Sequence, residues 1–305
     1  MFPFSAHSPE TSAMASLFRG VFLLSAAIFA LVAFLVIFGV IRFRSRGEGN
    51  PPQIEGSQML ETFWTAAPLI TVLILFVVTV RTMRVVDVPA EIRGDPDLVI
   101  IGHQWWWEGR YPNGAVAAGE IHIPAGRRLR VRVESADVIH DFWAPDLARK
   151  IDAVPGLPAD IWLNAASPGT YEGSCAEFCG VQHAWMRFTV VAEPEAVFNA
   201  WVGHQAEPAS AVIGAAVTGA EIFEQKHCGS CHTISGTSAT GQSGPDLTHL
   251  ALRRTLGSAM EQNTTDNLSR WIVHPQSAKP GNRMPESSVS DEEARQLLAY
   301  LETLR

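Results

Sequence analysis

Four side chains that bind soft metal ions lie within one short stretch, CAEFCGVQHAWM (residues 175–186). They are the thiols of Cys175 and Cys179, the imidazole of His183 and the thioether of Met186. This donor set suits copper or zinc better than calcium or magnesium. A catalytic triad would instead need a nucleophile beside a base, with a third group that orients the base. The stretch therefore predicts a metal site.

A blue-copper site uses two histidines, one cysteine and a weak axial methionine, and this chain offers one cysteine more. A second imidazole is present at His140, in SADVIHDFWAPDL. Two histidines, two cysteines and a methionine would overfill one copper ion, but they suit two copper ions bridged by both thiolates. His140 and His183 would each terminate one metal, with Met186 and the backbone carbonyl of Glu177 as weak axial donors. Such a centre shares one electron between two metals, which keeps the reorganisation energy small, and it carries out no bond chemistry.

The cysteine loop also has three other interpretations. A C-x-x-x-C pair outside the cytoplasm can form a disulfide. Two cysteines and a distant histidine can deliver copper, although such proteins have thioredoxin-like folds that the β pattern of this chain does not match. His183 can also be an ordinary core histidine. We favour the dinuclear copper centre because it uses every donor.

Cys228, Cys231 and His232 spell C-x-x-C-H, the motif that attaches a c-type haem covalently. Two thioethers reach the two vinyl groups of one porphyrin, and the adjacent histidine can then bind the iron. A thioredoxin-like pair would need a βαβ context, and a zinc site would need further cysteines or histidines nearby. Methionine is an expected sixth ligand. Between Met260 and Met284 we favour Met284, because it lies in the Pro/Gly loop KPGNRMPE.

Two uncharged apolar runs, residues 21–41 and 63–80, can each cross a bilayer, which takes about 20 apolar residues. The alternative for the first run is a cleaved signal sequence, but the run is longer than a signal core and arginines follow it instead of a small-residue cleavage site. The alternative for the second run is a buried soluble helix. Pro68 within the second run is tolerable in a membrane helix. We expect helices over about 17–42 and 62–82 that form a hairpin.

The loop between these helices carries Arg42, Arg44 and Arg46. The positive-inside rule places such a loop in the cytoplasm, although Arg81 and Arg84 after the second helix weaken the argument. Because haem c is attached outside the cytoplasm, both cysteine motifs are expected on the periplasmic or outer side of the cell membrane.

The amino-acid composition of the rest of the chain changes twice. Runs of β-branched residues punctuated by Gly and Pro predict short antiparallel strands in a sandwich or small barrel, at 98–102, 128–135 and 186–193. Small residues and Pro predict a linker within 205–220. Short helices are expected at 194–204, 267–275 and 290–304, the last with Ser290 as N-cap.

The length of 305 residues allows several domains. The net charge of −8, without a like-charged run, argues against a nucleic-acid partner. The expected plan is a head and membrane hairpin over 1–90, a β domain over 91–203, a linker over 204–215 and a haem domain over 216–305.

With these motifs together, the chain resembles subunit II of haem-copper cytochrome c oxidases, in the caa3-like variant with a cytochrome c domain fused at the C-terminus. The motifs that carry the resemblance are ETFWTAAPLI, GHQWWW, IHDFWAPDLARKIDAVPG, CAEFCGVQHAWM, KHCGSCH, GPDLTHL and KPGNRMP. The resemblance covers most of the chain. It implies a two-helix transmembrane hairpin, a cupredoxin-like antiparallel β-sandwich or barrel, and an all-α class I cytochrome c domain.

The resemblance also implies roles for individual residues. His140, Cys175, Cys179, His183 and Met186 would ligate the binuclear copper called CuA, with the carbonyl of Glu177. The Glu177 carboxylate would reach a magnesium ion at the interface with subunit I. Glu61 matches a carboxylate near the mouth of a proton channel, but it can equally be a charge at headgroup level. Trp105 matches an aromatic residue where electrons enter, although Trp106 stands where the family has Tyr, and a tryptophan run also suits a strand.

The function implied is electron input to a terminal oxidase. Electrons would pass from a c-type cytochrome or a bc1-type complex through haem c and CuA to the haems of subunit I. There, oxygen would be reduced to water and protons pumped, with subunit III as a further partner. No catalytic residue is expected on this chain itself. A quinol oxidase subunit lacks copper ligands, and nitrous oxide reductase needs a large His-rich domain. A nitric oxide reductase subunit and a membrane-tethered electron carrier or copper chaperone remain alternatives.

Overall fold

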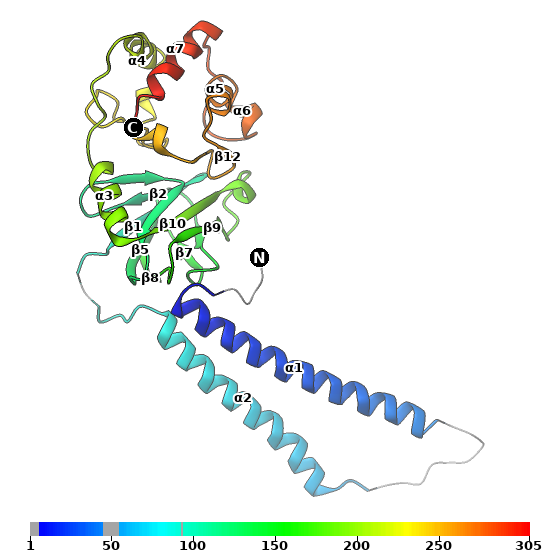
Figure 1. Cartoon of the computed structure of the whole chain (residues 1–305). Coiled ribbons are helices and arrows are strands. Elements are labelled where there is room, and N and C mark those ends of the chain that lie inside the picture. The colour runs from blue at the N-terminus through cyan, green and yellow to red at the C-terminus, as the bar shows by residue number, and fades with distance from the viewer. Residues whose placement is uncertain (1–5, 45–54, 93) are drawn as a thin grey trace. The chain divides into compact units, whose positions relative to one another are not determined.

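The computed structural model describes residues 6–44, 55–92 and 94–305 (Figure 1). The chain divides into two compact units, which are a helical unit ending at Asp87 and a second unit formed by His7–Pro9 and Val88–Arg305. Arg46, one of the three loop arginines, lies outside the described residues.

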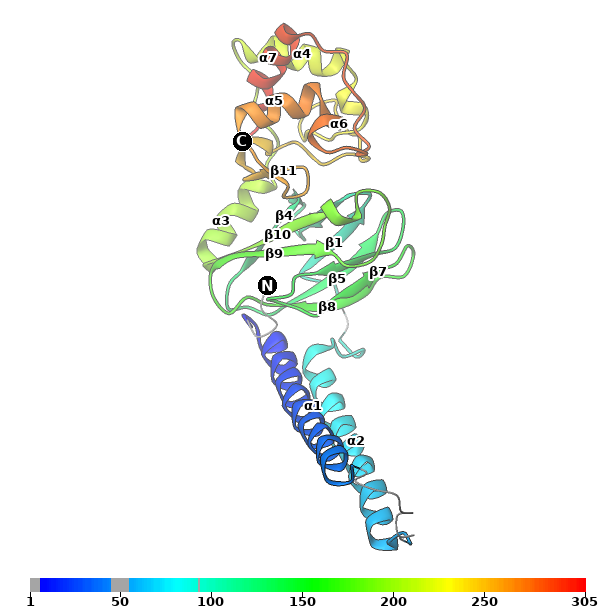
Figure 2. The same ribbon diagram turned by 90° about the vertical axis from the view of Figure 1, so that its right-hand side faces the viewer.

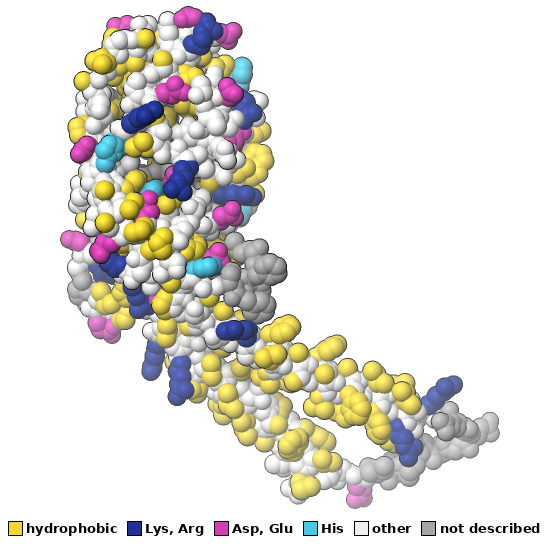
Figure 3. Space-filling model, in the orientation of Figure 1, with side chains coloured by type: hydrophobic (Ala, Val, Ile, Leu, Met, Phe, Trp, Pro, Cys, Tyr) yellow, Lys and Arg dark blue, Asp and Glu magenta, His cyan; other side chains and the backbone are white. Residues whose placement is uncertain are grey.

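The helical unit consists of α1 (Pro9–Arg42) and α2 (Gln58–Val86), which run in opposite directions (Figures 1 and 2). Both helices are long and apolar enough to cross a membrane. They extend beyond the expected bounds of 17–42 and 62–82, because hydropathy marks the depth of the bilayer and not the end of the hydrogen-bonded helix. α2 continues through Pro68. Many of their large apolar side chains are exposed, and Figure 3 shows them on one face, so these helices need lipid or partner helices around them.

The second unit begins with a sandwich of two five-stranded sheets (Figure 2). One sheet has the order β3-β2-β1-β5-β8, and the other has the order β4-β10-β9-β6-β7. The strands are β1 (Leu98–His103), β2 (Trp106–Arg110), β3 (Val116–Ala118), β4 (Glu120–Pro124), β5 (Leu129–Ser135), β6 (His140–Trp143), β7 (Ile151–Ala153), β8 (Ala159–Leu163), β9 (Gly169–Cys175) and β10 (Arg187–Glu193).

Most strand pairs are antiparallel, as the sequence predicts, but β1–β5 and β4–β10 are parallel. The reason is topological. Between β1 and β5 the chain crosses to the other sheet to form β4, so β5 returns beside β1 in the same direction. The core between the sheets is aromatic. The ring of Trp107 meets Phe142 and Phe188 edge-on, at centroid distances of 5.4 and 5.8 Å.

Helix α3 (Glu195–Gln205) follows β10, in agreement with the short helix expected there. The segment expected as a linker is only partly free of regular structure. It overlaps the end of α3, and α4 (Ala216–Gln225) already includes the last residues of the Pro- and Ala-rich stretch. Within it, Ala209 donates a backbone hydrogen bond to the carbonyl of Ser235 at 3.0 Å. A stretch of small residues does not oppose helix formation once an apolar partner surface is present.

The C-terminal part is helical around its own core. It contains α4, α5 (Thr265–Val273), α6 (Pro275–Ala278) and α7 (Asp291–Leu301), with 3-10 turns η2 (Cys228–Ser230) and η3 (Leu250–Leu252). α4 and α7 cross closely, and Phe223 meets Tyr300 edge-on at 5.8 Å. Ser290 caps α7, as the sequence predicts, and the structure adds a capping box with Glu293. A two-stranded hairpin, β11 (Thr255–Leu256) and β12 (Glu261–Gln262), is an addition to the all-α expectation, because two-residue strands leave no alternation pattern.

Candidate functional site

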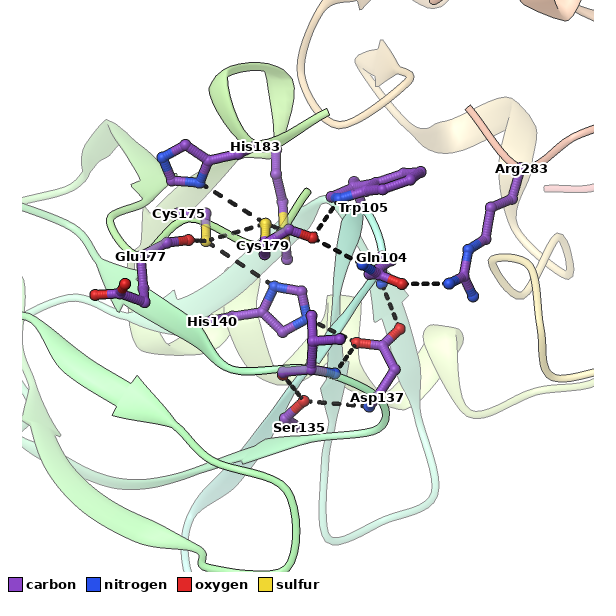
Figure 4. Close-up of polar contacts among 12 residues, drawn as sticks. Gln104, Trp105, Ser135, Asp137, His140, Cys175, Glu177, Cys179, His183 and Arg283 are labelled. Atoms are coloured by element: carbon purple, nitrogen blue, oxygen red, sulfur yellow. Dashed lines mark hydrogen bonds and ion pairs between the residues drawn. The ribbon is translucent and has the colours of Figure 1, made fainter. Parts of the chain in front are cut away.

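One end of the sandwich brings the donors of the candidate metal centre together (Figure 4). His140 opens β6 and Cys175 closes β9, and these strands are adjacent because Phe142 pairs with Cys175. Cys179 lies in the loop that follows β9. The ligand atoms of His140, Cys175 and Cys179 all lie within 4.8 Å of one another, and all three residues are buried.

The remaining predicted donors surround the same two sulfur atoms. His183 Nδ1 and Met186 Sδ are each 3.7 Å from Cys179 Sγ. His183 begins the 3-10 turn η1 (His183–Trp185), which turns the loop back into β10. On the other side, Cys175 Sγ is 3.2 Å from the carbonyl oxygen of Glu177. The structure therefore gathers the other four predicted donors around the pair of thiols.

The distance between the two sulfur atoms tests the disulfide interpretation. Cys175 Sγ and Cys179 Sγ are 3.7 Å apart, whereas a disulfide bond is about 2.05 Å long. Two sulfur atoms that each lie about 2.3 Å from one metal, at a tetrahedral angle, are about 3.8 Å apart. The spacing of the two thiols and the chemistry of the donor set therefore fit a thiolate-bridged metal site.

The two thiols differ in acidity without a metal. The hydrogen bond with Cys179, followed by that with His140, lowers the pKa of Cys175 to about 3 despite burial. The same pair interaction raises the pKa of Cys179, and burial adds to the rise. Thus one proton is held on the Cys179 side of the pair, and a metal that needs both thiolates must displace it.

Asp137 orients the buried imidazole of His140. Its Oδ1 lies 2.8 Å from His140 Nε2, which leaves Nδ1 facing Cys175 Sγ at 4.0 Å. Burial lowers the pKa of His140, but the hydrogen bonds with Cys175 and Asp137 outweigh it, so the net pKa is raised. Asp137 is itself held by the backbone N–H groups of Gln104 and Val138, at 2.7 Å each. Metal-binding histidines are commonly held through their second nitrogen in this way.

Trp105 and Gln104 contact the site from the loop between β1 and β2. Trp105 Nε1 and Gln104 Nε2 both donate to the carbonyl oxygen of Cys179, at 2.9 and 2.7 Å. Trp105 is half-buried. Its ring lies beside Gly180, whose φ of +120° few other residues adopt, and a Cβ at Gly180 would lie 2.9 Å from the ring.

Two predicted carboxylates, those of Glu177 and Glu61, stand apart from the metal donors. The side chain of Glu177 is exposed, and in Figure 4 its carboxylate points away from the sulfur atoms while its carbonyl points toward Cys175. Glu61 lies in the first turn of α2 and is exposed in the helical unit.

The haem motif lies on the turn after α4. Cys228 and Cys231 begin and follow η2, and His232 comes directly after them. His232 Nδ1 donates to the carbonyl of Pro245 at 2.7 Å, which leaves Nε2 free to bind iron. Burial lowers the pKa of His232, so the imidazole stays neutral, as a metal ligand must. Met284, the predicted sixth ligand, is half-buried in the loop after α6, where its backbone N–H donates to Asn282 Oδ1 at 2.7 Å.

Sequence reasoning missed Asp137 and Gln104, which contact the site, and Glu120, which contacts the haem domain. Asp137 had a local signal, because it lies three residues before His140. Gln104 directly precedes Trp105. Glu120 had no signal along the chain, because its partners lie more than 130 residues later.

Fold and site together define a membrane-anchored electron-transfer protein, with a cupredoxin-like β-sandwich and a cytochrome c domain. The sequence matches three family descriptions, "Cytochrome C oxidase subunit II, transmembrane domain" over residues 2–85, "Cytochrome C oxidase subunit II, periplasmic domain" over 116–193 and "Cytochrome c" over 216–305. The chain belongs to the cytochrome c oxidase subunit II family, in the form that carries a C-terminal cytochrome c domain.

Named relatives agree with this assignment. The chain is 36% identical to cytochrome c oxidase subunit 2 of Alkalihalophilus pseudofirmus over 289 residues, 92% of this chain and 84% of the relative. It is 29% identical to the same subunit of Bacillus subtilis, over 89% of this chain and 82% of the relative. Among solved structures, the periplasmic domain of subunit II from Bradyrhizobium japonicum is 30% identical and covers 37% of this chain and 95% of its own, with a TM-score of 0.36.

Proposed function

We propose that this chain is the electron-input subunit of a haem-copper terminal oxidase. In this proposal, electrons pass from an external donor through covalent haem c to binuclear CuA, and then to the haems of subunit I for reduction of oxygen to water coupled to proton pumping. A dinuclear copper centre supplies a one-electron carrier with small reorganisation energy.

The observation that carries the proposal is the contact between the Met284 loop and the candidate copper site. Arg283, next to Met284, donates to Gln104 Oε1 (Figure 4), and its guanidinium carbon lies 5.6 Å from the centre of the Trp105 ring. Gln104 and Trp105 both donate to the carbonyl of Cys179. The loop that carries the candidate haem ligand is thus linked to a candidate copper ligand through two residues.

The protein's own residues hold and insulate the centre. Cys175, Cys179, His140, His183 and Met186, with the Glu177 carbonyl, would hold the copper ions, which would supply one-electron transfer. Asp137 fixes the imidazole of His140, and the buried Met186 closes the site against the sandwich core. For the haem, Cys228 and Cys231 would form the thioethers, and His232 and Met284 would bind the iron.

Exposed apolar side chains beside the copper site support docking to subunit I. Phe178 is 76% exposed next to Glu177, and Ile139 is 46% exposed next to His140. Exposed apolar residues in such a group mark interaction surfaces. We propose that this surface faces subunit I, with the Glu177 carboxylate at a shared magnesium ion. Glu61 would lie near a proton channel, and both cofactor domains would face the periplasmic or outer side.

Metal analysis and electron paramagnetic resonance of the full-length chain test this function. With copper and haem c maturation supplied, we expect about two copper ions and one covalent haem per chain, with hyperfine lines from one electron shared by two copper nuclei. The chain should also co-purify with a multi-helix haem protein that consumes oxygen. A single-copper spectrum or a Cys175–Cys179 disulfide would contradict the CuA assignment and favour a tethered carrier or copper chaperone. Nitric oxide turnover by the partner would instead favour a nitric oxide reductase.

A further inference from the structure

A buried carboxylate at the start of β4 contacts the haem domain. Glu120 is only 5% exposed. Its Oε1 accepts three hydrogen bonds, from the backbone N–H of Arg254 at 2.8 Å, the backbone N–H of Thr255 at 2.7 Å and the hydroxyl of Thr255 at 2.8 Å. Burying a carboxylate is costly unless donors replace its water. Here the haem domain supplies them, and hydrogen bonds to a charged acceptor are stronger than neutral ones.

The hairpin that begins at Thr255 makes a second contact, with Trp105. Its turn places Ser258 and Ala259 at positive φ, +67° and +56°, a conformation that non-glycine residues adopt only where contacts hold them. Ser258 Oγ donates to the carbonyl oxygen of Trp105 at 2.7 Å. The buried Lys279 lies behind the turn and donates to the carbonyl of Gly257 at 3.1 Å.

We propose that residues 254–262 are a docking clasp, and that Glu120 is the positioning residue that fixes the haem domain on the copper site. The role of the clasp in electron transfer rests on the proposed function, but the contacts of Glu120 and of the hairpin do not depend on any cofactor. Two of the three groups that bind Glu120 are backbone amides, so recognition depends on the register of the hairpin. A shifted hairpin would leave Glu120 desolvated without donors. The clasp therefore selects one docked arrangement.

The clasp has a consequence for the electron donor. The hairpin covers the carbonyl side of Trp105, and Arg283 lies over its ring. A soluble donor protein therefore cannot dock on Trp105 while the clasp is closed, and it must deliver its electrons to the haem domain.

Amide hydrogen exchange of the full-length chain in detergent tests the clasp directly. In Glu120→Ala, exchange at Arg254 and Thr255 should rise about tenfold or more, because two amides lose a charged acceptor. Glu120→Gln keeps an acceptor oxygen and should restore most of the protection. Thr255→Val removes only the hydroxyl donor from the haem-domain side and should give a smaller rise in amide exchange. This variant tests the clasp even if Glu120→Ala folds poorly. The control is Glu195→Ala, which removes an exposed carboxylate whose ion pair with Arg127 spans 3.8 Å. Unchanged protection in both Glu120→Ala and Thr255→Val would overturn the proposal.

A second readout separates the clasp from the proposed function. In the assembled oxidase, dipolar spectroscopy between oxidised haem c and the copper centre should give a narrow distance distribution, which broadens in Glu120→Ala and narrows again in Glu120→Gln. A distribution equally narrow in the Ala variant would overturn the positioning role. Loss of amide protection in Glu120→Ala without any dinuclear copper signal in the wild type would support the clasp and contradict the proposed function.

Discussion

The indole N–H of Trp105 donates a hydrogen bond to the carbonyl oxygen of Cys179 at 2.9 Å. This bond joins the surface on which the haem domain lies to the backbone of a candidate copper ligand, and it requires the ring to lie against Gly180.

Gly180→Ala should therefore slow electron transfer to the copper centre while it keeps every candidate copper ligand. A Cβ at this position would lie 2.9 Å from the ring, and the φ of +120° disfavours alanine. Displacing the Trp105 ring, and with it the hydrogen bond to the Cys179 carbonyl, should slow reduction of the copper centre severalfold. Stopped-flow absorbance of haem c and copper would measure this rate. Gly114→Ala, at another positive-φ glycine where nothing lies within 4 Å of the added Cβ, is the control for backbone strain alone.

Asp137→Asn should weaken copper binding. The variant removes the negative charge that holds His140 Nε2 at 2.8 Å, and loss of such a supporting partner typically lowers metal affinity about 10- to 100-fold. Titration with a competing chelator would measure the change, and Glu134→Gln, three residues earlier in β5, provides a matched charge control. Equal affinities of Asp137→Asn and the wild type would show that His140 is held in place without Asp137.

Gly244→Ala should change haem ligation but keep the haem attached. A Cβ on Gly244 would lie 2.6 Å from the imidazole of His232, so the ring must shift, whereas both cysteine thioethers are untouched. We expect covalent haem at the wild-type level with an altered visible spectrum and a changed reduction potential. A wild-type spectrum and potential would mean that His232 does not need this close approach.

Gly219→Ala should destabilise the haem domain. Gly219 in α4 contacts α7 so closely that a Cβ would lie 2.0 Å from the carbonyl oxygen of Gln296. Overpacking of this kind costs about 1–3 kcal/mol. Gly203→Ala in α3 is the control, because nothing lies within 4 Å of the added Cβ and a helical Gly→Ala change there should stabilise by about 0.4–1 kcal/mol. Thermal unfolding followed by circular dichroism would compare the two.

Because of the buried Lys279, the free energy of unfolding should increase as the pH rises from about 8 to about 10.5. Burial lowers the pKa of Lys279 from 10.5 to about 8. Below about pH 8 the lysine is protonated in both the folded and unfolded states, and the folded state carries the full cost of a buried charge. Between about 8 and 10.5 the unfolded state binds more protons, so stability increases with pH, by an order of a few kcal/mol.

The difference in melting temperature between the wild type and Lys279→Met, measured from pH 7 to 10.5, isolates this effect from other titrating groups. A difference that stays constant across this range would show that the pKa of Lys279 is not lowered in the folded chain.

The sequence alone predicts the parts of this protein whose signals are local. Cys175, Cys179, His183 and Met186 share one loop, and Cys228, Cys231 and His232 share one turn, so spacing alone indicates most of both donor sets. The membrane helices follow from uninterrupted apolar runs, and the cap of α7 follows from Ser290. Such patterns can be recognised without knowledge of the fold because the residues that form them lie close together along the chain.

Only the tertiary structure brings residues that are distant along the chain into contact. His140 meets Cys175 from 35 residues away because β6 pairs with β9. Glu120 meets Thr255 from 135 residues away because the haem domain lies against the sandwich. The parallel strand pairs and the two-residue strands of the clasp likewise depend on partners far along the chain. No local pattern encodes such contacts, because the partners lie far apart along the chain and only the folded structure brings them together and buries them.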